Sequence, residues 1–199
     1  MMKAGQVLVE EHKVILKVLD CLEKVVRSAE EGEPIEKMDV EEILDFVRNF
    51  ADKTHHAKEE DRLFVVMEEH GFSRQMGPTG VMLSEHTMGR RCVKEMAEAL
   101  SGAAEGDGEQ RRRFCESARA FLSLLRNHIA KEDHCLFPMA ENALAPEERE
   151  RLYEDFVRIE REAGGKRHEI YIGKAEDLCK KFGVDFDKEE VPLLFKWKM

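Results

Sequence analysis

Two segments of the sequence carry the same pairing of a histidine with a glutamate four residues later. His56 is followed by Glu60 and His128 by Glu132, and both pairs have further acidic residues and a Leu-Phe pair close downstream. Residues four apart lie on one face of an α-helix, so each segment would direct an imidazole and a carboxylate to the same point. Two such pairs facing each other across a helical bundle would suit two iron or manganese ions. The repeat therefore predicts a dinuclear metal site.

Two more histidines occupy apolar stripes at helical spacing. His12 lies four residues after Leu8, and His86 belongs to a stripe of apolar residues in the third predicted helix. Four predicted helices thus each place one histidine toward the core. A buried carboxylate without a partner is costly, so Glu60 and Glu132 require a cation nearby. A metal site accounts for all of these residues together.

The elements that position these residues are four long helices and a helical tail, predicted from apolar residues that recur at helical spacing. The break at Gly32-Glu-Pro34 ends the first helix, and Pro78 precedes the third. The predicted helices span about residues 5–31, 39–71, 79–100 and 109–143. The tail runs from Pro146 to about residue 182 and is interrupted at Gly164-Gly165.

With these residues in place, the sequence resembles the hemerythrin-like (HHE cation-binding) family. The resemblance covers residues 5–143 and rests on one element per helix, in this order: His12, His56-x-x-x-Glu60, His86, His128-x-x-x-Glu132. It implies an all-α fold, an up-down-up-down four-helix bundle over residues 1–143. Residues 144–199 would form a C-terminal helical extension packed on this bundle.

The resemblance also implies a non-haem di-iron centre. Glu60 and Glu132 would bridge the two irons, with an oxo or hydroxo bridge between the ferric ions. The histidines of the first two helices, His12 and His56, would bind one iron, and those of the last two helices would bind the other. Ligand type alone does not select the metal, and manganese and zinc are the less expected alternatives.

One position departs from the oxygen-carrying members of the family, which have a fifth histidine one turn after the third-helix histidine. Here that position is Arg90. One iron would therefore have an open position, a water or a ligand from elsewhere. His168 is the predicted candidate because Glu160, Gly164 and His168 follow at four-residue steps, and the glycine would allow a close approach to the bundle.

Composition excludes some partners and locations. The net charge of −10 argues against nucleic acid as a main partner. No apolar run approaches the roughly 20 residues that span a bilayer, and the N-terminus lacks a secretory signal. The five cysteines are scattered without a C-x-x-C pair, which predicts reduced thiols in the cytoplasm. Apolar residues near the C-terminus, among them Leu193 and Trp197, would dock on the protein or on a second subunit, so a homodimer is possible.

Together these observations predict a di-iron protein that binds or reacts with dioxygen, nitric oxide or peroxide, in sensing, storage or protection. An open coordination position favours redox chemistry or gas binding over simple reversible carriage. The alternatives are an iron-delivering or iron–sulfur repair protein or a small peroxidase or oxidase, so enzymatic activity is left open. A third interpretation is an interaction bundle without a redox metal.

Overall fold

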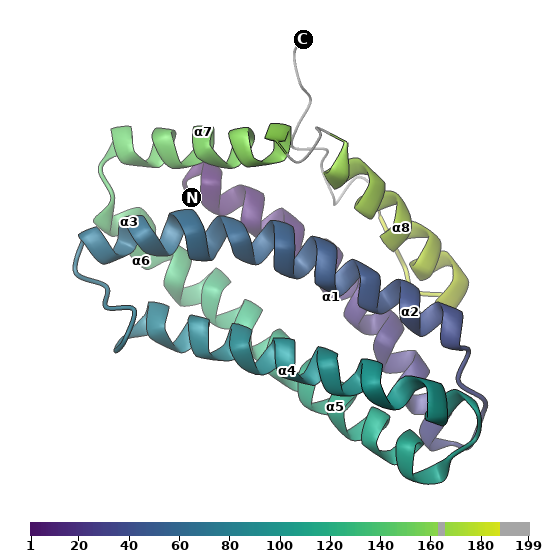
Figure 1. Ribbon diagram of the computed structural model, residues 1–199. Coiled ribbons are helices and arrows are strands. Elements are labelled where there is room, and N and C mark those ends of the chain that lie inside the picture. The colour runs from purple at the N-terminus through teal and green to yellow at the C-terminus, as the bar shows by residue number, and fades with distance from the viewer. Residues whose placement is uncertain (163–165, 188–199) are drawn as a thin grey trace.

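The computed structural model describes residues 1–162 and 166–187, and every regular element in these ranges is helical (Figure 1). Residues 3–143 form four long rods. The first rod is α1 (Lys3–Glu30), and the third is α4 (Pro78–Ala104). The second rod is built from α2 (Lys37–Phe46), η1 (Val47–His56), η2 (Glu59–Leu63) and α3 (Phe64–Glu69). The fourth is built from α5 (Gly108–Lys131), η3 (Glu132–Leu136) and α6 (Phe137–Ala143).

The helix ends lie where the local sequence favours them. Pro78 is the first residue of α4, a position at which the missing backbone N–H of proline costs nothing. Asp107 caps α5, because its side chain accepts hydrogen bonds from the backbone N–H groups of Glu109 and Gln110. Gly106 adopts a positive φ of 91° in the turn between α4 and α5, a conformation that favours glycine. All four predicted long helices are therefore present, although α4 runs to Ala104, four residues further than predicted.

The second and fourth rods are not α-helical throughout. The elements η1, η2 and η3 are π-helical, with hydrogen bonds from residue i to i+5 in place of i+4. Such segments are rare and change which side chains of a rod face the core. Both rods carry their π-helical segments where the sequence carries the predicted metal ligands. Helical spacing calculated for an ideal α-helix therefore does not hold at the site.

Two apolar clusters fill the space between the rods, and a polar layer separates them. One cluster holds Ile15, Phe46 and Phe114 with their neighbours, and the other holds Leu8 and Phe137 with theirs. The buried polar layer lies between the two clusters and contains most of the buried histidines and glutamates.

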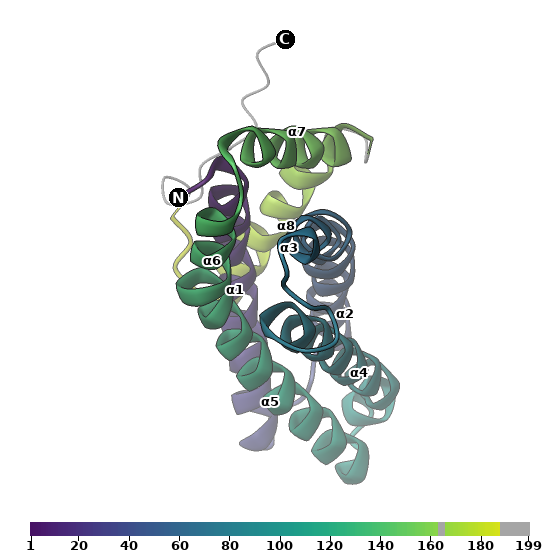
Figure 2. The same ribbon diagram turned by 90° about the vertical axis from the view of Figure 1, so that its left-hand side faces the viewer.

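The chain continues beyond the four rods as α7 (Pro146–Glu162) and α8 (Arg167–Phe182). Both helices pack against α1; α7 also contacts η2, and α8 also contacts α2 (Figures 1 and 2). Gly164-Gly165, the predicted interruption, lies outside the described residues, as do Leu193 and Trp197. The all-helical architecture is consistent with the predicted bundle. The up-down-up-down order and the division at residue 143 stay predictions.

None of the described helices is sufficiently long and apolar to span a membrane.

Candidate metal centre

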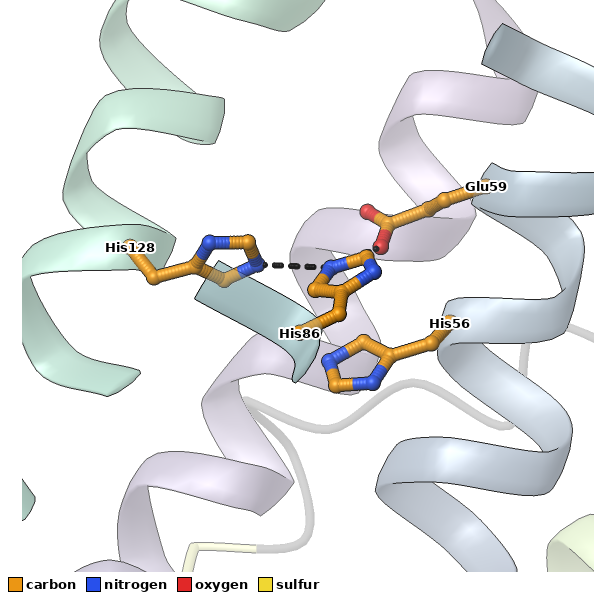
Figure 3. Close-up of side chains that lie close together, drawn as sticks. All are labelled: His56, Glu59, His86 and His128. Atoms are coloured by element: carbon orange, nitrogen blue, oxygen red, sulfur yellow. Dashed lines mark hydrogen bonds and ion pairs between the residues drawn. The ribbon is translucent and has the colours of Figure 1, made fainter. Parts of the chain in front are cut away.

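Seven side chains of the polar layer form two groups, each of which could hold one metal ion. His56, Glu59, His86 and His128 form the first group, shown in Figure 3. The second group consists of His12, His55, Glu59 and Glu132. Within each group, the potential ligand atoms all lie within 4.8 Å of one another. Glu59 belongs to both groups, so the two metal positions would be adjacent.

Both carboxylates link the two groups. The two oxygens of Glu59 lie 3.5 Å from Nε2 of His55 and 3.5 Å from Nε2 of His86. The two oxygens of Glu132 lie 3.3 Å from Nε2 of His12 and 3.2 Å from Nε2 of His128. Each carboxylate therefore faces one histidine of each group, which is the arrangement that a bridging carboxylate requires.

All five histidines of the two groups are held by a carboxylate at Nδ1. The pairs are His12 with Asp133 at 2.8 Å, His55 with Glu11 at 2.9 Å, His56 with Asp52 at 3.3 Å, His86 with Glu60 at 2.6 Å and His128 with Glu85 at 2.9 Å. An Nδ1–H that donates to a carboxylate leaves the Nε2 lone pair available to a metal. This second partner also fixes the ring orientation, as is common for histidines that bind metals.

Several buried atoms at the centre lack the hydrogen bonds that burial normally requires. Within the described part of the chain, no hydrogen bond reaches Nε2 of His12 or any carboxylate oxygen of Glu59 and Glu132. The Nε2 atoms of His86 and His128 lie only 3.0 Å apart, although each ring already has its Nδ1 bound to a carboxylate. Buried polar atoms without partners are costly, and cations between them would satisfy all of these atoms at once. The donor set and its orientation therefore fit metal ions.

The ionisation of Glu59 and Glu132 in the metal-free site also favours metal binding. Burial and the adjacent negative charge of Glu132 raise the pKa of Glu59 well above its ordinary value. Burial alone would also raise the pKa of Glu132, but the adjacent imidazoles of His128 and His12 hold that pKa well below its ordinary value. One buried carboxylate thus keeps a proton while the other is ionised. Metal ions would displace that proton and neutralise both carboxylates.

The structure brings together five of the seven ligands predicted from the sequence: His12, His56, His86, His128 and Glu132. Glu60 lies outside both groups. Its Oε1 lies 2.6 Å from Nδ1 of His86 and 2.7 Å from the Arg90 guanidinium, and its side chain is 21% exposed. Glu59, which is completely buried, occupies the central place expected for Glu60.

The exchange of Glu60 for Glu59 follows from the π-helical turns. The prediction counted four residues from His56 along an ideal α-helix, whereas η1 and η2 allow His55, His56 and Glu59 all to face the centre. A signal in the sequence supports the observed register. Leu63 follows Glu59 by four residues, just as Leu136 follows Glu132, so the matching segments are His55-x-x-Lys-Glu59 and His128-x-x-Lys-Glu132.

The same register reveals an approximate twofold repeat. Glu11-His12 in α1 corresponds to Glu85-His86 in α4. Glu11 accepts a hydrogen bond from His55 and pairs with Lys58. Glu85 does the same with His128 and Lys131. The acidic partners of His12 and His86 also correspond, since Asp133 and Glu60 each follow a central glutamate, Glu132 or Glu59, by one residue. His56 has no counterpart, since Ile129 occupies its place in the second segment. The first group therefore has three histidines and the second has two.

His168 and Glu160 also lie outside both groups, in a separate cluster of buried charges. Nε2 of His168 is 3.6 Å from a carboxylate oxygen of Glu11, and Glu160 is 2.6 Å from the ammonium of Lys58. Lys58 is completely buried and also pairs with Glu11. The additional histidine at the centre is thus His55, which lies beside His56 in the sequence.

Comparison with known proteins agrees with this site. The family described as hemerythrin HHE cation binding domain matches residues 4–140, which include every member of both groups. The chain is also similar to three uncharacterized proteins, one of Mycobacterium bovis and two of Mycobacterium tuberculosis. It is 24% identical to each over 182 residues, which are 91% of this chain and 71% of each relative. No solved structure matches the chain significantly.

Proposed function

We propose that this protein, which belongs to the hemerythrin HHE cation-binding domain family, holds two iron ions and binds or reacts with dioxygen, nitric oxide or peroxide at them. Glu59 and Glu132 would bridge the two ions, so Glu59 takes the role that the sequence assigned to Glu60. The histidines of the first group, His56, His86 and His128, would bind one ion, and His12 and His55 would bind the other.

The observation that carries this proposal is the set of five histidines whose Nδ1 atoms are each held by a carboxylate, around two buried carboxylates that make no hydrogen bond within the described residues. A mixture of imidazole and carboxylate ligands is typical of non-haem iron sites. Thiolates, which select other metals, are absent from both groups.

The two ions would be inequivalent because the two groups differ in histidine content. With two bridging carboxylates, the ion in the first group would have five protein ligands, and the ion in the second group four. The second ion would therefore offer room for an external ligand. When bound, iron ions supply electrons and an open coordination position, and the chain determines which molecules reach them.

Apolar side chains beside His12 and His86 limit access by water on their side of the site and hold these ligands in place. The ring of Phe137 stacks on His12 with 5.7 Å between centroids, and Phe64 stacks on His86 at 6.0 Å. Leu8 and Phe64 are completely buried, and Met82 is nearly so. These apolar side chains favour small uncharged ligands and disfavour loss of the bound ions to solvent.

The proposal is tested with protein that is purified anaerobically, loaded with ferrous iron and exposed separately to dioxygen, nitric oxide and hydrogen peroxide. We expect about two irons per chain and a change in the visible absorption spectrum with at least one of these ligands. A protein that binds no iron, or whose iron responds to none of the three, would refute the proposal.

The same experiment separates carriage from turnover. A spectrum that reverses under argon would indicate reversible binding, as in sensing or storage. Repeated consumption of peroxide in the presence of a reductant would indicate a peroxidase, and transfer of iron to an acceptor protein would indicate iron delivery.

A further inference from the structure

An elongated cavity of about 440 Å³ opens beside the first group of histidines. It lies between the second rod, α4 and α5. One end of its lining is formed by His56, His86 and His128, together with the charged side chains of Asp52, Glu85 and Arg90. Its volume falls within the range of about 300–1,000 Å³ that is typical of pockets for small organic molecules. Dioxygen, nitric oxide and peroxide are far smaller than this space, so they do not account for it.

The middle of the cavity is apolar. It is lined there by Val47, Ala51, Val93, Phe121, Leu124 and Leu125. Gly89 adds no side chain to the wall, and a Cβ atom at this position would lie 3.7 Å from the ring of Phe121 and 3.9 Å from Leu124. The cavity is therefore open partly because residue 89 is a glycine, and a Cβ atom there would make only ordinary van der Waals contacts.

The end of the cavity far from the histidines is lined by two cations, Arg48 and Lys94, and one carboxylate, Glu98, so it carries a net positive charge. Lys94 follows His86 by eight residues of α4, which is about 12 Å along the helix axis, and Arg48 precedes His56 by eight residues on the second rod. Arg48 is exposed and has no ion pair within the described residues, whereas Lys94 has only a 3.8 Å contact with Glu98. In a chain of net charge −10, two weakly paired cations at the mouth of an apolar cavity are suited to an anionic head group.

We propose that this cavity binds an unbranched aliphatic carboxylate. Its carboxylate would lie at Arg48 and Lys94, and its chain would lie over Phe121 with its end beside His56 and His86. Burial of the methylene groups provides most of the affinity, and the cations fix the direction of the molecule. This binding does not depend on the reaction proposed above, because none of the apolar contacts involves a metal ion.

Isothermal titration calorimetry of the full-length, as-purified protein with decanoate tests the proposal. We expect saturable binding to one site per chain, with hexanoate at least tenfold weaker because it buries fewer methylene groups. Gly89→Leu and Ala97→Leu, which fill the middle and the far end of the cavity, should each weaken decanoate binding about tenfold or more.

The head group is tested by charge variants and by a neutral analogue. Arg48→Ala should weaken decanoate about threefold while leaving 1-decanol unchanged. Lys53→Ala, on the same rod but outside the lining, is the matched control and should leave both affinities unchanged. A loss of decanol binding equal to that of decanoate in Arg48→Ala would overturn the assignment of the head group.

Two results would overturn the proposed site: no saturable binding of decanoate, or binding that survives both Gly89→Leu and Ala97→Leu. Iron content and circular dichroism, measured on every variant, show whether the metal centre and the fold are intact. A preparation that contains no iron but binds decanoate would support this site and count only against the proposed function.

Discussion

Replacing Glu59 should have opposite effects on the metal-free and the metal-loaded protein. Without metal, Glu59 is completely buried, faces the negative charge of Glu132 and has no hydrogen bond within the described residues. A buried polar group without a partner costs about 1–3 kcal/mol. Glu59→Gln keeps the size of the side chain, fixes it in the uncharged form and adds an NH2 group that can donate to the carboxylate of Glu132. We therefore expect the metal-free variant to be at least as stable as the wild type, and up to about 3 kcal/mol more stable.

With metal, the same substitution removes a bridging ligand. We expect iron content to fall from about two ions per chain to one or none, and the stabilisation provided by bound metal to fall with it. The assay combines elemental analysis with thermal unfolding of metal-free and iron-loaded samples; a change of 1 kcal/mol corresponds to about 2–4 °C for a chain of this length.

Two matched variants complete the experiment. Glu60→Gln should keep two irons and reduce affinity by about 10- to 100-fold, because Glu60 holds His86 through Nδ1. Glu69→Gln, exposed at the end of α3, should change neither quantity. The reasoning is refuted if Glu60→Gln loses an iron while Glu59→Gln keeps two, or if metal-free Glu59→Gln is much less stable than the metal-free wild type.

Three further predictions concern protons and buried charge. In the metal-free protein, burial lowers the pKa of His12, but the hydrogen bond to Asp133 and the nearby carboxylate of Glu132 outweigh burial and raise this pKa to about 9. Because a ligand must lose its proton before it binds a metal, metal affinity should rise with pH up to about 9. A flat affinity in chelator competition from pH 6 to 9 would contradict this. Asp133→Asn should keep two irons but weaken their binding about 10- to 100-fold, and a loss of stoichiometry in the same competition assay would show that Asp133 is itself a ligand. Lys58→Met should destabilise the protein by about 3–5 kcal/mol because it leaves two buried carboxylates without their cation. Lys131→Met should cost about 1 kcal/mol or less, since Lys131 is 42% exposed, and equal losses in urea unfolding would contradict the difference in burial.

Much of the architecture could be predicted because helical periodicity and helix ends depend on local sequence. The apolar stripes gave the four rods, and Pro78 marks the start of α4. His12 and His86 could be identified as core histidines because they lie in α-helical segments, where residues three or four apart share a face.

The proposed ligand set could not be obtained from helical spacing in the same way. His55 and Glu59 face the centre together with His56 because the second rod contains π-helical turns. Ideal α-helical spacing from His56 instead selects Glu60 and leaves out His55. The sequence does contain a signal for the observed register: Leu63 follows Glu59 by four residues, just as the equivalent Leu136 follows Glu132.

The contacts of the extension depended on tertiary packing rather than on spacing. The four-residue steps from Glu160 to His168 suggested metal ligands, but α7 brings Glu160 to the buried Lys58 and α8 brings His168 to Glu11. A fully buried lysine gives no signal in the sequence, because lysine is almost always exposed.

The most direct test of the central claim is a crystal structure of the iron-loaded protein with anomalous diffraction recorded at the iron absorption edge. The account predicts two iron peaks between Glu59 and Glu132, one beside His56, His86 and His128 and the other beside His12 and His55. A single peak, or a peak bound by Glu60 or His168, would contradict it.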